Sequence, residues 1–335
     1  MPYILGIEGT AHSLGLALLD TLSLEFIYEI QSQYQPELGG IHPREAARFM
    51  GDMFPKVFEQ CIVESEISLS ELTGVAFSQG PGLGPCLRTI ATTARTIALS
   101  LDIPLIGVNH CVAHIELGKK LTNCQNPLVI FASGGNTQII VLGENSQKYQ
   151  ILGETLDMAL GNALDTLARE LGLPHPGGPI IMKLAQSGQE LIELPYTVKG
   201  MSLSFSGLVT AAIKKFKKEN VSIEDLSFSF QEYAFGMLAE VTERALACTE
   251  KKELLLTGGV AANLHLREML ELVAKEHEAT AFFIPIKHAG DNGAMIAWTG
   301  YLHHLAKDFL PIETSQVIPR WRINEAKIPW KSITS

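Results

Sequence analysis

The sequence lacks the features of a membrane-spanning, targeted or disordered protein. No apolar stretch approaches the ~18 residues that a spanning helix needs, and the apolar start at Tyr3–Ile7 runs directly into Glu8 with no basic region before it. Aromatic residues make up only 7% of the chain, but 46% of it is hydrophobic and 19% charged, which is typical of a folded, aliphatic-rich protein. We therefore expect a cytoplasmic protein that has no contact with a membrane.

Cysteine pairs and excess positive charge are also missing. The five cysteines are widely spaced and form no C-x-x-C motif, so we expect them to be reduced and inert. Twenty-six Lys and Arg residues against 36 Asp and Glu residues give a net charge of −10, which repels nucleic acid. A polynucleotide partner would need a local basic patch, such as Lys214–Lys218, or a helper protein.

The length of 335 residues and the pattern of elements predict two α/β lobes. Each half begins with three strands and then alternates helices with strands, which indicates an internal duplication facing across a cleft; two unrelated α/β domains are the alternative. The expected organisation is an N-terminal lobe with an inserted helical segment (1–125), a C-terminal lobe with a helical insertion (126–320) and a tail or linker (321–335). Strands are expected at 3–8, 14–19, 24–30, 74–77, 105–108, 128–131, 138–142, 149–152, 254–257 and 281–284. Helices are expected at 44–63, 87–100, from 109, and at 157–171, 208–218, 224–248, 260–274 and 291–305.

Two histidines have a spacing that suits a metal site. His110 and His114 are four residues apart, so a helix would project both imidazoles from one face. Asp291, at an expected helix start, could add an oxygen ligand, and such a set leaves coordination positions open for substrate. The alternatives are a pair of core or solvated histidines and an aspartate that only caps its helix.

Glycine-rich turns offer places for a phosphate or an adenylate. Gly9–Thr10 and Ser133–Thr137 occupy equivalent positions in the two halves, and their backbone N–H groups could form anion nests or merely reverse the chain. A third glycine-rich segment, Thr257–Asn263, follows a strand and precedes a helix, where α/β proteins hold ligands. No P-loop motif occurs.

Three further polar or flexible positions could face a ligand. Asn263 offers both a donor and an acceptor beside that helix start. Asp165 is expected on the same helical face as Asp157, eight residues earlier, and could bind a ribose or amino group. Gly178, in the turn His175–Pro179, could present its backbone to a ligand. An exposed helix carboxylate and tight turns that only permit packing are the alternatives.

The chain resembles the universal TsaD/Kae/Qri family in the order and spacing of the motifs GIEGTAHS, SQGPGLGPCLR, NHCVAHIE, ASGGNTQ, SFSGL, LTGGVAAN and GDNGAMIA. The first of these motifs looks archaeal or eukaryotic. The resemblance implies a two-lobed actin-like fold (ASKHA, as in sugar kinases, Hsp70 and actin) made of duplicated RNase H-like domains. It also implies a metal-dependent acyltransferase, which moves threonylcarbamoyl from threonylcarbamoyl-AMP to the exocyclic amine of the adenosine next to the anticodon in tRNAs that read A-starting codons.

Carried over residue by residue, the resemblance makes His110, His114 and Asp291 the ligands of one catalytic iron or zinc ion. The positions that match the family's adenylate contacts, which ATP or its analogues could also occupy, are Ser133, Gly134, Gly135, Asp165, Gly178 and Asn263. The chain departs from the family's pattern in having Phe131 where many archaeal relatives have Tyr, and Met182 where relatives often have Glu. No general base is identified.

The resemblance also implies partners. Archaeal and eukaryotic relatives work in the KEOPS complex, with a small atypical kinase, a small dimerising subunit on the N-terminal helices and a tRNA-binding subunit, so tRNA would be held mainly through the partners. Two other functions remain open, an ATP-dependent small-molecule kinase of the same fold and a non-enzymatic nucleotide-binding scaffold. A metallopeptidase is disfavoured because the H-E-x-x-H motif is missing.

Overall fold

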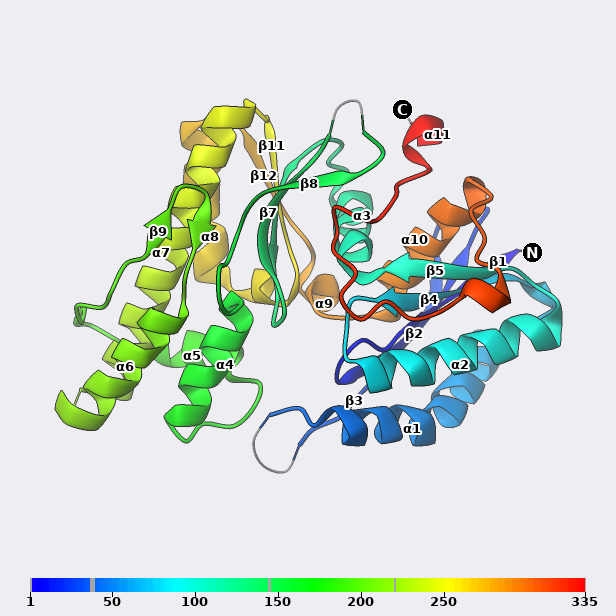
Figure 1. Cartoon of the computed structure of the whole chain (residues 1–335), viewed down its shortest axis with the longest axis horizontal. Coiled ribbons are helices and arrows are strands. Elements are labelled where there is room, and N and C mark those ends of the chain that lie inside the picture. Colours follow the sequence, from blue (N-terminus) through cyan, green and yellow to red (C-terminus); the bar gives the residue numbers. More distant parts are fainter. Residues whose placement is uncertain (1, 37–39, 144–145, 220, 335) are drawn as a thin grey trace. The chain divides into compact units, whose positions relative to one another are not determined.

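The computed structural model describes residues 2–36, 40–143, 146–219 and 221–334 (Figure 1). The chain forms two compact units: the first comprises residues 1–117, 143–149 and 291–335, and the second comprises residues 118–142 and 150–290. Among the described residues, no helix combines the length and the apolar character that crossing a membrane requires. Each unit is built on a five-stranded sheet.

The first unit has the strand order β3-β2-β1-β4-β5. The three leading strands are antiparallel neighbours, and β4 and β5 continue the sheet parallel to β1. Its elements are β1 (Tyr3–Glu8), β2 (Ser13–Asp20), β3 (Phe26–Gln33), α1 (Pro43–Glu64), β4 (Leu72–Gly80), α2 (Gly84–Leu101), β5 (Leu105–Asn109), the start of α3 (His110–Thr122), α10 (Gly293–Leu305) and α11 (Lys331–Thr334).

Strand β1 is buried along its whole length because helices cover both faces of the sheet. Leu5 and Ile7 join the hydrophobic cluster that α1 and α2 form on one face. On the other face α10 packs against β1 (Figure 1). The two elements are so close that a Cβ atom on Gly6 would come within 2.2 Å of the backbone nitrogen of Ala297. Glycine in β1 therefore lets α10 pack directly on the strand, which fixes the position of the residues that precede α10.

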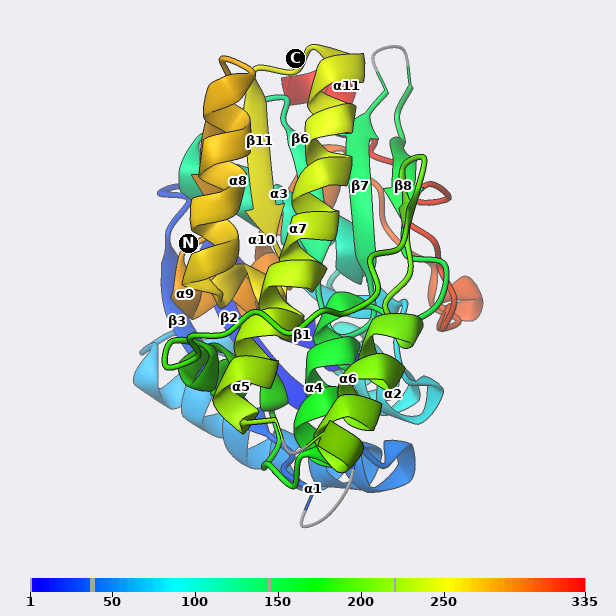
Figure 2. The same ribbon diagram turned by 90° about the vertical axis from the view of Figure 1, so that its left-hand side faces the viewer.

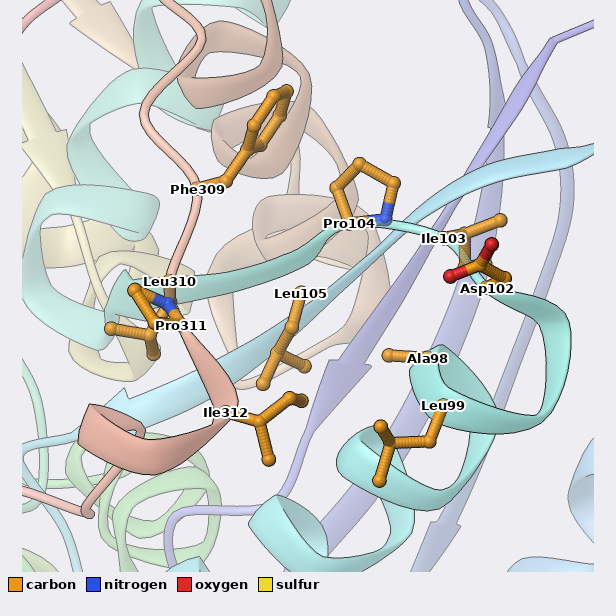
Figure 3. A pocket seen from close by; sticks show the side chains of 10 residues that line it. All are labelled: Ala98, Leu99, Asp102, Ile103, Pro104, Leu105, Phe309, Leu310, Pro311 and Ile312. Carbon is orange, nitrogen blue, oxygen red and sulfur yellow. The ribbon is translucent and has the colours of Figure 1, made fainter.

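A cavity of about 340 Å³ lies beside β5, between the end of α2 and residues 309–312 (Figure 3). Its lining is mostly aliphatic and includes Leu99, Leu105 and Ile312, with Asp102 as the charged member. An adenylate site needs several convergent polar groups, which this lining does not offer among the described residues. None of the ligand-binding residues expected from the sequence lines this cavity.

The second unit repeats the architecture of the first. Its strand order is β12-β11-β6-β7-β8. When the strands of each sheet are numbered in chain order and this sheet is read from the β8 edge, both sheets have the order 3-2-1-4-5. Figure 2 shows α7 and α8 in front of this sheet. The elements are β6 (Leu128–Ala132), β7 (Thr137–Leu142), β8 (Tyr149–Glu154), α4 (Leu160–Glu170), α5 (Gly177–Ala185), β9 (Val198–Lys199), β10 (Ser202–Leu203), α6 (Ser206–Glu219), α7 (Ile223–Thr249), β11 (Glu253–Thr257), α8 (Leu264–Glu276), β12 (Thr280–Phe283) and α9 (Ile286–Ala289). The predicted duplication is confirmed at the level of sheet topology.

Three expectations about helices were wrong. The helix expected from residue 157 begins at Leu160, because residues 155–158 form a loop closed by the Asp157 side chain. The expected turn at 175–179 instead leads into α5, since the prolines there occupy the helix N-terminus, where a missing N–H costs nothing. The helix expected from residue 260 starts as a 3₁₀ turn, and α8 begins at Leu264.

Candidate functional site

The two histidines lie where β5 gives way to α3. Asn109, the last residue of β5, accepts the backbone N–H groups of Cys111 and Val112 with its Oδ1 atom, at 3.0 and 3.1 Å. This side chain caps the first turn of α3, so the helix starts directly at His110. One turn later His114 stands on the same face, with the two ring centroids 4.8 Å apart. The predicted helical pairing of the imidazoles is confirmed.

Asp291 faces both imidazoles from the segment before α10. Its Oδ1 atom lies 3.4 Å from Nε2 of His110 and 3.2 Å from Nε2 of His114. The capping role considered for Asp291 is wrong, because Asn292 is the N-cap and accepts the N–H of Met295 at 3.0 Å. With Asn292 as the cap, the carboxylate of Asp291 is directed at the histidines.

These three side chains have the spacing of metal ligands. Their ligand atoms all lie within 4.8 Å of one another. Bonds of ~2.1 Å at tetrahedral or octahedral angles would place neighbouring ligand atoms about 3.0–3.4 Å apart, as the two carboxylate–imidazole distances are. The side chain of His114 is fully buried whereas that of Asp291 is 21% exposed. The group can therefore hold a divalent metal that keeps one side open to a substrate.

Charge interactions within the cluster alter its titration. Burial alone would lower the pKa of His110, but the carboxylates of Glu8 and Asp291 raise that pKa well above its ordinary value. Burial lowers the pKa of His114. Burial would raise the pKa of Asp291, but the two imidazoles hold it well below its usual range. The arrangement thus concentrates negative charge around His110, which favours a cation at this position.

Glu8 is a member of the site that sequence reasoning missed. It ends β1, is fully buried, and its Oε2 atom lies 3.1 Å from Nδ1 of His110. The available signal was a carboxylate at the end of an otherwise apolar strand, a position where burial requires a partner. Glu116, two residues after His114, is also buried and accepts the Tyr149 hydroxyl at 2.6 Å.

The turn Ser133–Gly135 lies in the second unit, between β6 and β7. The Oγ atom of Ser133 accepts the N–H groups of Gly135 and Asn136, at 3.3 and 3.0 Å, which holds the turn in shape. Gly134 and Gly135 are exposed, and a Cβ atom at either position would meet no protein atom within 4 Å. Packing within the chain therefore does not require glycine here, whereas close approach of a ligand to the backbone would.

The remaining expected adenylate contacts also lie in the second unit. Asp165 accepts the N–H of Gly177 at 2.8 Å and so holds the start of α5. Beside it, Gly178 has its nearest prospective Cβ neighbour, Leu164, at 3.9 Å. Asn263 is the N-cap of α8, and its Nδ2 atom donates to Oε1 of Gln231 at 2.8 Å. Asp165 and Asn263 thus make hydrogen bonds that hold helix starts within this unit.

Two departures from the family's pattern have clear positions. Phe131 is fully buried in β6, where a phenyl ring offers no metal ligand. Met182 lies half-buried on α5, and its thioether gives this position an apolar rather than an acidic side chain.

Asp157 does not share a helical face with Asp165, contrary to expectation. It accepts the N–H groups of Phe205 and Ser206 at 2.9 and 3.1 Å, together with the hydroxyls of Ser204 and Ser206. Partial burial would raise the pKa of Asp157, but these hydrogen bonds bring it well below its usual range. The carboxylate therefore connects the loop before α4 to the start of α6 through hydrogen bonds.

We expect Asp157→Asn to destabilise the chain at neutral pH and to do so less in acid. Because the folded pKa is depressed, the carboxylate stabilises the fold above its unfolded pKa of about 3.9, and this contribution is lost as the pH falls toward the folded pKa. The loss at pH 7 should be about 1 kcal/mol, since solvent screens this largely exposed group. Urea midpoints of both proteins between pH 7 and pH 3.5 test this, and a gap that widens in acid would contradict it.

Comparisons with known proteins place the chain in one family. The profile of the TsaD family, described as tRNA N6-adenosine threonylcarbamoyltransferase, matches residues 24–298. A Methanococcoides burtonii protein of that description is 50% identical over 334 residues, which cover 98% of both chains. A probable bifunctional tRNA threonylcarbamoyladenosine biosynthesis protein of Methanothermobacter thermautotrophicus is 50% identical over 97% of this chain. This chain spans about 60% of the length of that relative and of others like it.

Solved structures agree with the fold at low sequence identity. The crystal structure of T. kodakarensis HypF superposes over 91% of this chain and 48% of its own, with a TM-score of 0.62 and 16% identity. The mixed α/β architecture of two repeated sheets is the actin-like ASKHA fold, so the predicted fold class is confirmed.

Proposed function

Since the chain belongs to the TsaD family of tRNA N6-adenosine threonylcarbamoyltransferases, we propose that it carries out this transfer itself. The donor is threonylcarbamoyl-AMP, and the acceptor is the exocyclic amine of the adenosine next to the anticodon in tRNAs that read A-starting codons. The observation that carries the proposal is the cluster of His110, His114 and Asp291, which joins a metal-ligand geometry to the family's motifs.

The reaction is an acyl transfer at the carbamoyl carbon. The adenosine amine forms a C–N bond to this carbon, the C–O bond to the phosphate breaks, and AMP leaves while the amine loses a proton. His110, His114 and Asp291 would hold one iron or zinc ion, which when bound supplies positive charge for the phosphate oxygens. A set with two imidazoles suits these metals better than Mg²⁺, which prefers oxygen ligands, and so favours the transferase over a kinase of the same fold.

The adenylate is proposed to bind the second unit. The turn at Ser133, Gly134 and Gly135 would present its backbone to the nucleotide, because the glycines are exposed and have open space above them. Gly178 would do the same at the start of α5, beside Asp165 and near the positive end of a helix. Asn263 would add polar contacts at the start of α8. ATP or its analogues are expected to occupy the same positions.

The tRNA is proposed to be held mainly by partner proteins of the KEOPS type: a small atypical kinase, a small dimerising subunit on the N-terminal helices and a tRNA-binding subunit. The net charge of −10 supports a helper, because an acidic chain repels the phosphate backbone. In α6, moreover, Lys215 and Lys217 pair with the carboxylates of Glu219 and Glu170, which reduces the positive charge of this stretch.

The proposal is tested by supplying the chain with enzymatically generated threonylcarbamoyl-AMP and a tRNA that reads A-starting codons. We expect threonylcarbamoyladenosine in the digested tRNA, measured by mass spectrometry, and a rate that rises on addition of the three KEOPS-type partners. A tRNA carrying guanosine next to the anticodon is the matched control. Consumption of ATP with a small hydroxylated substrate, and no modified tRNA with or without partners, would favour a kinase instead.

A further inference from the structure

A fully buried carboxylate lies directly behind the proposed metal centre. Glu8 is 0% exposed, and its Oε1 atom accepts the N–H and the hydroxyl of Thr10 at 2.8 and 2.6 Å. The other oxygen, Oε2, lies 3.1 Å from Nδ1 of His110. Removing a carboxylate from water is costly unless donors surround it, and these three donors meet that need.

The contact between Glu8 and His110 determines which nitrogen of the ring faces Asp291. A carboxylate oxygen is a hydrogen-bond acceptor, so the contact with Oε2 of Glu8 favours the tautomer of His110 that has its N–H at Nδ1. The opposite nitrogen, Nε2, is the one that lies 3.4 Å from Asp291. Glu8 therefore acts on the ring from the side away from the ligand cluster.

Thr10 restricts Glu8 in turn. Two donors from a single residue hold Oε1, so the carboxylate has little freedom to turn away from His110. Both residues belong to the first unit, with Glu8 as the last residue of β1 and Thr10 two residues after it. Helix α10 packs closely on β1 and so supports this segment. The ring of His110 is thus oriented by the sheet as well as by its own helix.

We propose that Glu8 is a positioning residue for a metal ligand, with Thr10 holding it in place. A carboxylate that accepts from the outer nitrogen of a ligating imidazole fixes its tautomer and orientation and makes its inner nitrogen a better donor. This inference rests on the proposed metal centre and deepens it, because it gives a role to a fully buried carboxylate that stands outside the ligand group.

The test is the affinity of the purified chain for Zn²⁺, measured by competition with a chromophoric chelator, and the absorption spectrum of Co²⁺ bound in its place. We expect Glu8→Gln to bind Zn²⁺ about 10- to 100-fold more weakly than the wild type and to shift the Co²⁺ bands. Thr10→Val should weaken binding in the same direction by a smaller factor, whereas Thr10→Ser, which keeps the hydroxyl, should not.

Glu116→Gln is the matched control, because Glu116 is another buried carboxylate of the same unit that stands outside the ligand group. Its Zn²⁺ affinity should equal that of the wild type. If Glu8→Gln does not fold, the two Thr10 variants decide the question alone. Wild-type affinity and an unchanged Co²⁺ spectrum in Glu8→Gln, or in Thr10→Val if that variant decides alone, would overturn the positioning role. A wild-type chain that binds no Zn²⁺ or Co²⁺ would overturn the metal centre itself.

Discussion

Replacing His110 and His114 together by alanine should abolish transfer of threonylcarbamoyl to tRNA, with a fall in rate on the order of 10³-fold or more. The two imidazoles supply both nitrogen ligands of the cluster, so their loss leaves Asp291 as its one remaining member. The bound metal should be lost with the activity. Elemental analysis and the tRNA assay, run on the same preparations, measure the two effects.

The control for this variant must separate the loss of ligands from the loss of fold. His277→Ala removes an imidazole at the end of α8, in the second unit, where its Nε2 atom lies 3.7 Å from Glu243. It should keep both metal and activity. Because His114 is fully buried, His114→Gln offers a variant of closer volume, and its thermal unfolding should stay near that of the wild type. Full transfer by the double variant would contradict the proposed role of the histidines.

Replacing Gly134 by valine should weaken adenylate binding by at least about tenfold, with little change in stability. A side chain at this position meets no protein atom within 4 Å of its Cβ, so the fold can accommodate it. A ligand that lies against the turn cannot, since the side chain fills the space that the backbone offers to the nucleotide. Calorimetry with ATP or AMP gives the dissociation constant, and thermal unfolding gives the stability.

Two other glycines of the second unit calibrate that result. Gly236→Ala, in α7, places a Cβ 3.8 Å from Tyr196 and should leave nucleotide binding unchanged. Gly161→Ala should lower both stability and binding, because its Cβ would come within 2.7 Å of the Ser133 carbonyl oxygen and push the turn aside. Wild-type affinity in Gly134→Val would show that this turn does not bind the nucleotide.

Periodicity and spacing were sufficient for most of the fold and for the residues that form the cluster of His110, His114 and Asp291. The strands of both sheets follow apolar runs, and the repeated order of strands and helices indicated the duplication that the two sheets show. The pairing of His110 with His114 follows from helix geometry alone. Asp291 was identifiable by residue type and by its position before a helix, although its distance to the histidines depends on how α10 packs on β1.

The features that the sequence did not predict are set by local hydrogen bonds or by tertiary contacts. Asp291 and Asn292 are both good caps, and only the backbone angles decide that Asn292 is the one used. The local pattern predicts a helix at Asp157, but α4 begins only at Leu160. Asp157 instead bonds to residues about fifty positions later, which a local pattern does not contain. Glu8 contacts His110 across 102 residues of sequence, a pairing that no short-range pattern contains.

The most direct test of the account is the rate of transfer as a function of metal occupancy. The chain is stripped with a chelator and reloaded with increasing Fe²⁺ or Zn²⁺, and the bound metal and the modified tRNA are measured in each sample. We predict no transfer without metal, and a rate that rises in proportion to occupancy until one ion is bound per chain. Full transfer by the metal-free chain would contradict the account.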